Sequence, residues 1–298
     1  MMRQWRKGLI AGVLVAAALF AVACGDSDDD SDNGNGGTVA PREFPAGSTM
    51  AEIVGRGKLV VGVKYDVPLF GLLDPVSRKV DGFDVAMAKE IARELGLRED
   101  QIEFTEAISA NRIPFLQEDK VDLIISTMTI NAQRKEQIEF SRPYYLAGQS
   151  ILVLKSNTDV NSVTDLNGKS VCSAQGSTSE QNVAAQAPQA QLLPLQTYST
   201  CVSAMKDGRV VAVSTDDIIL AGYAAADNTL KLVGGQFTSE PYGIGIKKGN
   251  TDMADFVSDV IADMLADGRW EALYNQYLGN VGGLPSAAEA KSALPATP

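Results

Sequence analysis

Residues 121–134 read VDLIISTMTINAQR, a short and largely apolar run that gives way to a polar loop and then to an arginine. The run from Val121 to Ile125 is typical of a strand that is buried on both faces of a sheet. Arg134 follows the loop after this strand, and its planar guanidinium group suits a carboxylate that accepts two hydrogen bonds. The arginine is therefore a candidate for anion binding, with an ordinary surface arginine as the alternative.

Apolar strands and amphipathic helices alternate on the N-terminal side of this segment. Residues 58–63 form a short apolar run, and residues 84–95 carry apolar side chains at helical spacing before Gly96, a residue typical of helix ends. A strand at 102–104 and a helix at 110–117 are expected next. Such alternation predicts an α/β fold with a mainly parallel sheet.

A second unit starts near Ser150 and has its own periodicity, which predicts a second core. Its expected elements alternate in the same way, with strands at 151–154, 169–172 and 210–213 and helices at 200–206 and 216–226. A length of 298 residues also favours two cores over one.

The C-terminal part of the chain is mainly helical in pattern. A strand is expected at 242–246, and apolar side chains at helical spacing follow between Met253 and Leu265. Core packing explains this stripe better than a partner-binding face does. A last helix is expected at 268–278, and residues 280–298 have no periodicity, which predicts a disordered tail.

Residues 1–23 have the features of a signal peptide. Arg3, Arg6 and Lys7 precede an apolar segment, Leu9–Ala23, which is shorter than the roughly 20 residues of a membrane-spanning helix. A short membrane anchor helix is the alternative. No later stretch is long and apolar enough to span a bilayer, so the mature chain is expected to have no transmembrane segment. The signal peptide predicts a place outside the cytoplasm.

Residues 21–25, AVACG, resemble a bacterial lipobox with alanine in place of the usual leucine. The resemblance implies that Cys24 is diacylated, which would anchor the chain to the cell membrane through an N-terminal lipid. We predict a lipidated flexible linker at 24–50, because residues 26–37 contain no apolar side chain. Alternating aspartates there resemble a calcium loop, but Val39 occupies the position of that loop's closing glutamate.

The composition argues against several function classes. The chain contains no histidine, and its residue pattern supports neither a zinc site nor a catalytic nucleophile pair, so no metal, cofactor or catalytic residue is expected. A formal net charge of -11 disfavours nucleic acid as a partner. Cys172 and Cys201 are an even pair outside the cytosol, which predicts a disulfide, with two buried free thiols as the alternative.

Several segments together resemble the polar amino-acid-binding family (family 3) of periplasmic-type solute-binding proteins, and especially its glutamate-binding lipoproteins. The similarity runs from about Lys58 to Gly279. The segments that carry it are 82–85 (GFDV), 126–134 (STMTINAQR), 140–145 (FSRPYY), 171–180 (VCSAQGSTSE), 197–201 (TYSTC) and 212–220 (AVSTDDIIL). Ala86 departs from the pattern, because the family often has an acidic residue there.

The resemblance implies a two-lobed periplasmic-binding-protein-like α/β fold with two hinge crossovers and a ligand between the lobes. Lobe 1 would comprise residues 51–147 and 242–279, and lobe 2 residues 148–241. A return crossing near Pro241 agrees with the sequence pattern, since a single crossover would leave the C-terminal helices without a lobe.

The resemblance also assigns roles to residues on both lobes. Arg134 would hold the α-carboxylate of a free amino acid. From the other lobe, Gly176, Ser177 and Thr178 would offer backbone N–H groups at a helix start to the same carboxylate, although a simple helix cap explains Ser177 equally well.

Asp216 corresponds to the acid that binds the α-ammonium group in this family. The Thr129 hydroxyl and the Ser126 carbonyl would complete that cage, and Thr127 belongs to the same predicted ligand-binding loop. Asp217 is adjacent, and either aspartate could instead be a helix N-cap.

Lys64 and Arg112 are the candidates for binding a ligand's side-chain carboxylate, with solvated cations as the alternative. On this interpretation the chain is an extracytoplasmic, lipid-anchored and monomeric lipoprotein. It would capture an amino acid, with glutamate favoured, and deliver it to the permease of an ABC importer. Glutamine, aspartate and asparagine remain open as ligands.

Two other function classes stay open at this point. The first is a ligand-sensing lipoprotein that signals to a partner. The second is a small-acid dehydratase on the same fold, for which Glu106 or Glu180 could supply an acid or a base.

Overall fold

The computed structural model of the chain describes residues 43–296. The predicted signal peptide, the lipidation site Cys24 and residues 24–42 of the predicted linker lie outside the described residues. Within 43–296, none of the helices combines the length and the apolar character that a membrane crossing requires.

Lobe 1 is built on a five-stranded sheet in the order β5-β1-β6-β15-β7. The strands are β1 (Leu59–Val63), β5 (Ile102–Glu106), β6 (Leu123–Ile124), β7 (Ile138–Phe140) and β15 (Gly245–Lys247). Val61 and Leu123 pack into a core with α2 (Phe83–Glu94), whereas Ile124 packs on the opposite face with Leu116 of α3 (Arg112–Gln117). Both faces are covered, which explains why the β6 segment is apolar without alternation.

Lobe 2 has a second five-stranded sheet, in the order β11-β10-β12-β9-β13. Its strands are β9 (Gln149–Leu154), β10 (Ser170–Ala174), β11 (Gln191–Leu195), β12 (Ala212–Asp216) and β13 (Leu230–Val233). Ile151 packs with α5 (Thr178–Gln186) on one face. On the other face, Leu152 packs with α6 (Tyr198–Lys206) and α7 (Asp217–Ala226), so this lobe has a core on each side of its sheet.

Each of these sheets mixes parallel and antiparallel pairs. β1 is parallel to β5 and β6, and β10 is parallel to β11 and β12. β15 and β9 are antiparallel to both of their neighbours. These two strands enter their lobes directly from the hinge, without the helical crossover that a parallel neighbour needs, so the prediction of mainly parallel sheets is only half right.

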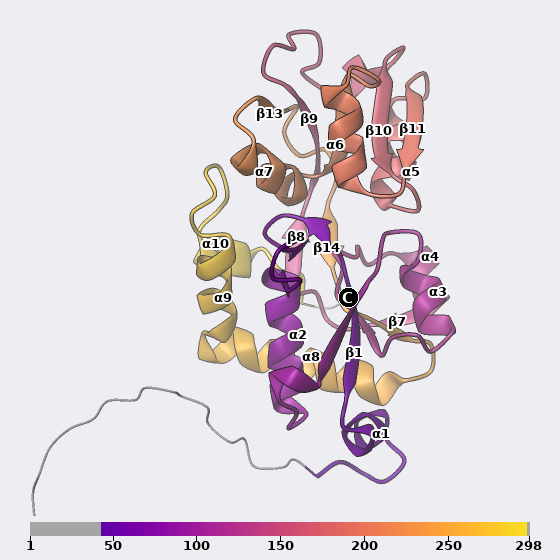
Figure 1. Cartoon of the computed structure of the whole chain (residues 1–298), viewed down its shortest axis with the longest axis vertical. Coiled ribbons are helices and arrows are strands. Elements are labelled where there is room, and N and C mark those ends of the chain that lie inside the picture. Colours follow the sequence, from indigo (N-terminus) through magenta and orange to yellow (C-terminus); the bar gives the residue numbers. More distant parts are fainter. Residues whose placement is uncertain (1–42, 297–298) are drawn as a thin grey trace, which may run out of the picture. The chain divides into compact units, whose positions relative to one another are not determined.

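Two crossing strands join the lobes, as predicted. β8 (Tyr145–Ala147) pairs antiparallel with β14 (Glu240–Tyr242), and Figure 1 shows this pair between the two sheets. The expected single strand at 242–246 is divided, because β14 ends at Tyr242 and β15 begins at Gly245. A small sheet of β2 (Asp66–Val67), β3 (Gly71–Leu73) and β4 (Val80–Asp81) lies in lobe 1.

The C-terminal helices close lobe 1. The predicted stripe lies on α8 (Thr251–Asp267), where its members Met253 and Val257 are fully buried, so core packing is its role. Gly268 adopts a left-handed conformation with φ of 89° and separates α8 from α9 (Arg269–Tyr277). That conformation favours glycine at the break.

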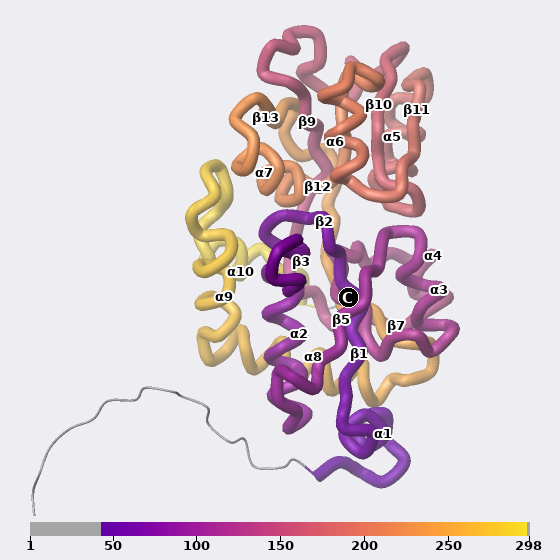
Figure 2. The backbone as a smooth tube through the Cα atoms, viewed as in Figure 1, coloured from indigo at the N-terminus to yellow at the C-terminus, as the bar shows by residue number. Residues whose placement is uncertain are grey.

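The prediction of a disordered tail at 280–298 is wrong for part of its length. Residues 287–292 form α10 (Ala287–Ser292), which Ser286 caps, and Ala287 is buried. The Tyr274 hydroxyl donates to the Pro285 carbonyl at 2.7 Å, which ties the segment to α9, and Figure 2 shows α10 in yellow beside α9. A helix this short repeats too few turns for periodicity to reveal it.

The predicted linker at 24–50 also ends earlier than expected. Phe44 packs edge-on against Phe256 with ring centroids 5.5 Å apart. Ser48 caps α1 (Thr49–Arg56), and Met50 is buried. The last residues of that linker therefore belong to the folded body. The remaining elements are the short helix α4 (Ala132–Lys135) and the 3-10 turns Glu99–Gln101 and Val163–Leu166.

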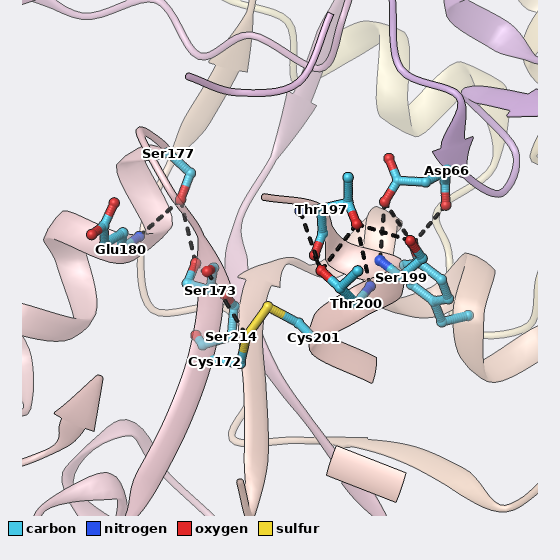
Figure 3. Close-up of a disulfide and its surroundings, with 11 residues drawn as sticks. Asp66, Cys172, Ser173, Ser177, Glu180, Thr197, Ser199, Thr200, Cys201 and Ser214 are labelled. Carbon is cyan, nitrogen blue, oxygen red and sulfur yellow. Dashed lines mark hydrogen bonds between the residues drawn. A yellow bond between two sulfur atoms is a disulfide. The ribbon is translucent and has the colours of Figure 1, made fainter. Parts of the chain in front are cut away.

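The predicted disulfide is present in the structure. Cys172 on β10 and Cys201 on α6 are bonded, with their Cα atoms 5.4 Å apart and both residues fully buried. Figure 3 shows the bond joining the strand to the helix. The disulfide fixes α6 to the strand that leads to Gly176, one of the predicted ligand-binding residues.

Candidate functional site

The predicted ligand-binding residues come from both lobes and meet where the lobes face each other. From lobe 1 they follow the ends of β1 and β6 or start α3, and from lobe 2 they follow β10 or end β12. Nine of these ten residues are buried, and the tenth, Gly176, is exposed. A concentration of buried polar groups at strand ends is unusual for a core and is typical of a binding site.

Arg134 is fixed by its own short helix and reaches lobe 2. Asn131 caps α4 by accepting a hydrogen bond from the Arg134 backbone N–H at 2.8 Å. The Arg134 Nη1 atom donates to the Thr129 carbonyl at 2.7 Å, and Nη2 lies 3.4 Å from the Gly176 carbonyl of lobe 2. The residue is 7% exposed, so it is not the surface arginine of the alternative interpretation.

Burial leaves the Arg134 charge poorly compensated. Burial lowers the pKa of Arg134 to about 9, and the charge of Arg112 acts in the same direction. A cation whose protonated form is disfavoured in this way gains most from an anion placed beside it. The guanidinium group is therefore suited to a ligand carboxylate.

The loop after β10 approaches lobe 1 closely. Gly176 has φ of +76°, and a Cβ atom there would lie 3.0 Å from the Ala110 Cα atom. A larger residue would hold the lobes apart. Ser177 accepts a hydrogen bond from the Glu180 N–H at 3.0 Å, and the Gly176 N–H donates to the Glu180 carboxylate at 2.8 Å. Ser177 thus caps α5, as the alternative interpretation has it.

Thr178 connects this loop to the hinge and to lobe 1. Its hydroxyl donates to the Glu240 carboxylate at 3.0 Å and lies 3.4 Å from the Thr129 hydroxyl of lobe 1. The helix start is therefore in contact with both a hinge strand and the opposite lobe.

Asp216 is the one buried carboxylate of the described residues with an oxygen that lacks a hydrogen bond. Its Oδ2 atom accepts from the Tyr242 hydroxyl at 2.6 Å, whereas Oδ1 is buried without a partner. Burial raises the pKa of Asp216 to about 7, and the charge of Glu240 acts in the same direction. A buried carboxylate oxygen in this state needs a donor, and a ligand ammonium group would supply one.

The helix-cap alternative does not describe Asp216, because its side chain makes no capping bond to α7. Asp217 has a different role at the hinge. Its carboxylate accepts from the Gly148 N–H at 3.2 Å and from the Gln236 side chain at 2.7 Å. The two adjacent aspartates therefore have separate partners.

Lys64 and Arg112 are both 3% exposed, so they are not solvated cations. The Lys64 ammonium group donates to the Ser109 hydroxyl at 3.0 Å and lies 5.6 Å from the centre of the Tyr198 ring. Burial lowers the pKa of Lys64 to about 7, and the nearby charge of Arg112 lowers it as well. Burial also lowers the pKa of Arg112 itself.

Arg112 holds the loop that follows β6. Its Nη1 atom donates to the Ser126 carbonyl at 2.9 Å and to the Thr127 carbonyl at 3.1 Å, and its Nε atom donates to the Ser109 carbonyl at 3.3 Å. The Ser126 carbonyl, which was expected to accept from a ligand ammonium group, thus already accepts from an arginine. Arg112 is first of all a support for the loop.

Two site residues were missed by sequence reasoning. Asp84 is fully buried in α2, where it accepts from the Tyr144 hydroxyl at 2.6 Å and from the Thr127 N–H at 2.9 Å. An acid on the apolar face of a helix is a signal that could have identified Asp84. Glu240, 4% exposed on β14, precedes Pro241 in a segment without any such pattern.

Comparison with known proteins shows the family to which the chain belongs. Residues 59–280 match the family model of the bacterial extracellular solute-binding proteins, family 3. The chain is 37% identical over 270 residues to the ABC transporter glutamine-binding protein GlnH of Bacillus subtilis (strain 168), covering 90% of this chain and 96% of that protein. It is 36% identical over 285 residues to the glutamate-binding protein GluB of Corynebacterium glutamicum, covering 92% and 90%.

A solved structure has the same two-lobed arrangement. An ancestral arginine-binding protein bound to glutamine aligns with a TM-score of 0.71 and 38% sequence identity, covering 76% of this chain and 99% of that one. The family match and these similarities extend through both lobes and the hinge. The chain therefore belongs to family 3 of the bacterial extracellular solute-binding proteins.

Proposed function

We propose that this solute-binding protein captures a free amino acid, with glutamate as the favoured ligand, and delivers it to an ABC importer. The observation that carries the proposal is the unpaired, buried Oδ1 atom of Asp216 in lobe 2, an acid whose charge acts on the buried Arg134 of lobe 1. A free amino acid carries an ammonium and a carboxylate group about 3 Å apart, and each is costly to bury without a matching charge. Arg134 and Asp216 supply such a pair.

Binding of this kind would close the protein. The carboxylate would interact with Arg134 of lobe 1 and with the Gly176 to Thr178 loop of lobe 2, and the ammonium group with Asp216 of lobe 2. A ligand that touches both lobes favours the closed state by its difference in affinity for the two states. An importer can recognise that closed state.

The choice of glutamate rests on the buried cations. Lys64 has a lowered pKa because its charge is buried beside that of Arg112. An acidic ligand side chain would compensate this charge, whereas a neutral amide would not. Glutamine is the second candidate, because one of the similar proteins is named for glutamine and another for glutamate.

A dehydratase has less support from the geometry. Glu106 is exposed on β5, and the Glu180 carboxylate accepts a hydrogen bond from its own Gly176 loop. Neither acid is among the contacts of Arg134 or Asp216. We also propose a diacylated Cys24 and a monomeric state for the mature protein; mass spectrometry that found an unmodified thiol at Cys24 would contradict the anchor.

A thermal-shift panel of the common amino acids tests the proposal. Glutamate should raise the melting temperature most, because at equal ligand concentration the stabilisation of the folded state increases as the Kd of the ligand falls. Arg134→Ala should abolish the shift, whereas Arg98→Ala, an exposed arginine of the same lobe, should leave it unchanged. A panel in which no amino acid shifts the melting of the wild type would overturn the proposal.

A further inference from the structure

The lobes also meet at a second place, where β2 of lobe 1 lies against α6 and α7 of lobe 2. Figure 2 shows the indigo β2 segment directly below these two helices. The Asp66 Oδ2 atom accepts hydrogen bonds from the Ser199 backbone N–H at 3.0 Å and from the Tyr223 hydroxyl at 3.3 Å. The same hydroxyl donates to the Asp66 carbonyl oxygen at 2.6 Å.

The backbones approach each other closely at this contact. A Cβ atom on Gly222 of α7 would lie 2.9 Å from the Pro68 carbonyl oxygen and 3.2 Å from the Pro68 Cβ atom. Glycine is therefore the residue that allows α7 to rest on the β2–β3 turn. The contact joins lobe 1 directly to lobe 2, outside the hinge strands. It must therefore break when the lobes separate.

The chemistry of the contact favours a carboxylate. Ser199 lies in the first turn of α6, where backbone N–H groups lack intrahelical acceptors and the helix end carries a partial positive charge. Asp66 therefore supplies, from the other lobe, an acceptor and a negative charge to that helix end. Figure 3 shows the Asp66 carboxylate directed at Ser199.

The disulfide connects this contact to the ligand site. Cys201 lies two residues beyond Ser199 in α6 and is bonded to Cys172 of β10. That strand leads into the Gly176 loop, whose carbonyl lies near Arg134. The disulfide therefore joins α6, which Asp66 contacts, to β10, which leads into the proposed ligand-binding loop.

We propose that Asp66 is a positioning residue that latches lobe 2 to lobe 1 in the closed state and so raises ligand affinity without touching the ligand. The inference rests on the proposed function, because a latch affects affinity only where a ligand closes the lobes. The apparent affinity of such a protein scales with the population of its binding-competent state. Loss of the latch therefore weakens every ligand by the same factor.

Calorimetry and stopped-flow dissociation of glutamate and glutamine test this latch in the mature protein. Asp66→Ala removes both hydrogen bonds to the carboxylate, from the Ser199 N–H and from the Tyr223 hydroxyl. It should raise the Kd of both ligands about tenfold or more and should speed dissociation. Tyr223→Phe should raise the Kd of each ligand about threefold. The ratio of the glutamate Kd to the glutamine Kd should not change, and Asp66→Asn, which keeps an acceptor for Ser199, should recover part of the affinity.

A matched control exists within lobe 1. The Tyr277 hydroxyl donates to the Asp81 carboxylate at 2.8 Å, which is the same chemistry without a contact between lobes. Asp81→Ala should therefore retain the wild-type Kd and dissociation rate.

Wild-type affinity and dissociation rates in both Asp66→Ala and Tyr223→Phe would overturn the latch while leaving the proposed function intact. A changed ratio between the two ligands would overturn it too, because it would mean that Asp66 touches the ligand. A wild-type protein that binds no amino acid would overturn the proposed function and the latch with it.

Discussion

Tyr242 donates its hydroxyl to Asp216 across 2.6 Å, so a hinge strand orients the acid that ends β12. Tyr242 also forms a bridge with Thr129, a residue of the loop that precedes Arg134. The hinge therefore contacts both halves of the proposed amino-acid site.

Tyr242→Phe should weaken binding. The lost hydrogen bond stabilises the Asp216 carboxylate, so its removal raises the pKa of that group further above its usual range. We expect glutamate affinity at pH 7 to fall by about 1–2 kcal/mol, which calorimetry measures directly. Tyr277→Phe, whose tyrosine bonds an aspartate elsewhere in lobe 1, serves as the control. Equal affinities for wild type and Tyr242→Phe would show that the bond does not support the site.

The pH dependence of binding should follow Asp216. Its pKa is raised to about 7 in the structure, in which the lobes are in contact, and an ammonium group beside it would lower that value. A glutamate side chain beside Lys64, whose pKa is also about 7, would make that lysine take up protons, so the test uses Lys64→Met. In this variant binding should release protons, and affinity should fall as the pH is lowered from 8 to 5. Calorimetry in buffers of different ionisation enthalpy measures this release, and an affinity that does not vary over this range would contradict the assignment.

The stability of the ligand-free protein should depend on pH in the opposite direction to the contribution of Asp216 to binding. A carboxyl group with a raised pKa in the native state binds more protons there than in the unfolded chain. The contribution of Asp216 to the stability of the ligand-free closed form is therefore greatest below its usual pKa near 4, and it is lost as the pH rises towards about 7. Asp216→Asn should flatten this part of the profile of unfolding free energy against pH.

Lys64→Met should change selectivity more than overall stability. It removes a buried cation whose pKa is lowered to about 7 and keeps the length of the side chain. We expect glutamate to lose about tenfold or more in affinity relative to glutamine, because one charged contact is lost. Lys79→Met, an exposed residue of lobe 1, is the control. If the two ligands change equally, Lys64 does not contact the ligand side chain.

The disulfide should stabilise lobe 2. Cys172 and Cys201 are 29 residues apart, and on the chain-entropy model closing a loop of that size contributes about 3 to 4 kcal/mol. Cys172→Ala with Cys201→Ala should lower the unfolding free energy by about this amount in denaturant titrations. An unchanged midpoint would show that packing around the cysteines holds α6 without the bond.

The sequence predicts the scaffold better than the site. The apolar β6 run and the helical stripe of α8 have patterns that depend on burial alone, and burial repeats at fixed intervals. The two crossings are implied by the family resemblance, with which the sequence pattern agrees. Asp84 has only the weaker signal of an acid on an apolar helix face, and Glu240 has none. Each is a single acid whose partners come from distant segments. Their partners can be identified only when the chain is folded.

The sequence also does not reveal every contact of the predicted site residues, because their partners lie elsewhere in the chain. Arg112 is predicted as a ligand contact, and the structure adds that it donates to the carbonyl groups of Ser126 and Thr127. Nothing local in the sequence distinguishes an arginine that binds a ligand from one that supports a loop. The segment at 287–292 was missed because its helix is fixed by contacts with α9.

The most direct test of the amino-acid site is a calorimetric titration of the mature protein with glutamate, comparing wild type with Asp216→Asn. This substitution keeps the size of the side chain and removes the negative charge that would face the ligand ammonium group. We predict a loss of at least a hundredfold in affinity, about 2.7 kcal/mol or more, because a buried ammonium group would be left without a counter-charge. Wild-type affinity in Asp216→Asn would contradict the account.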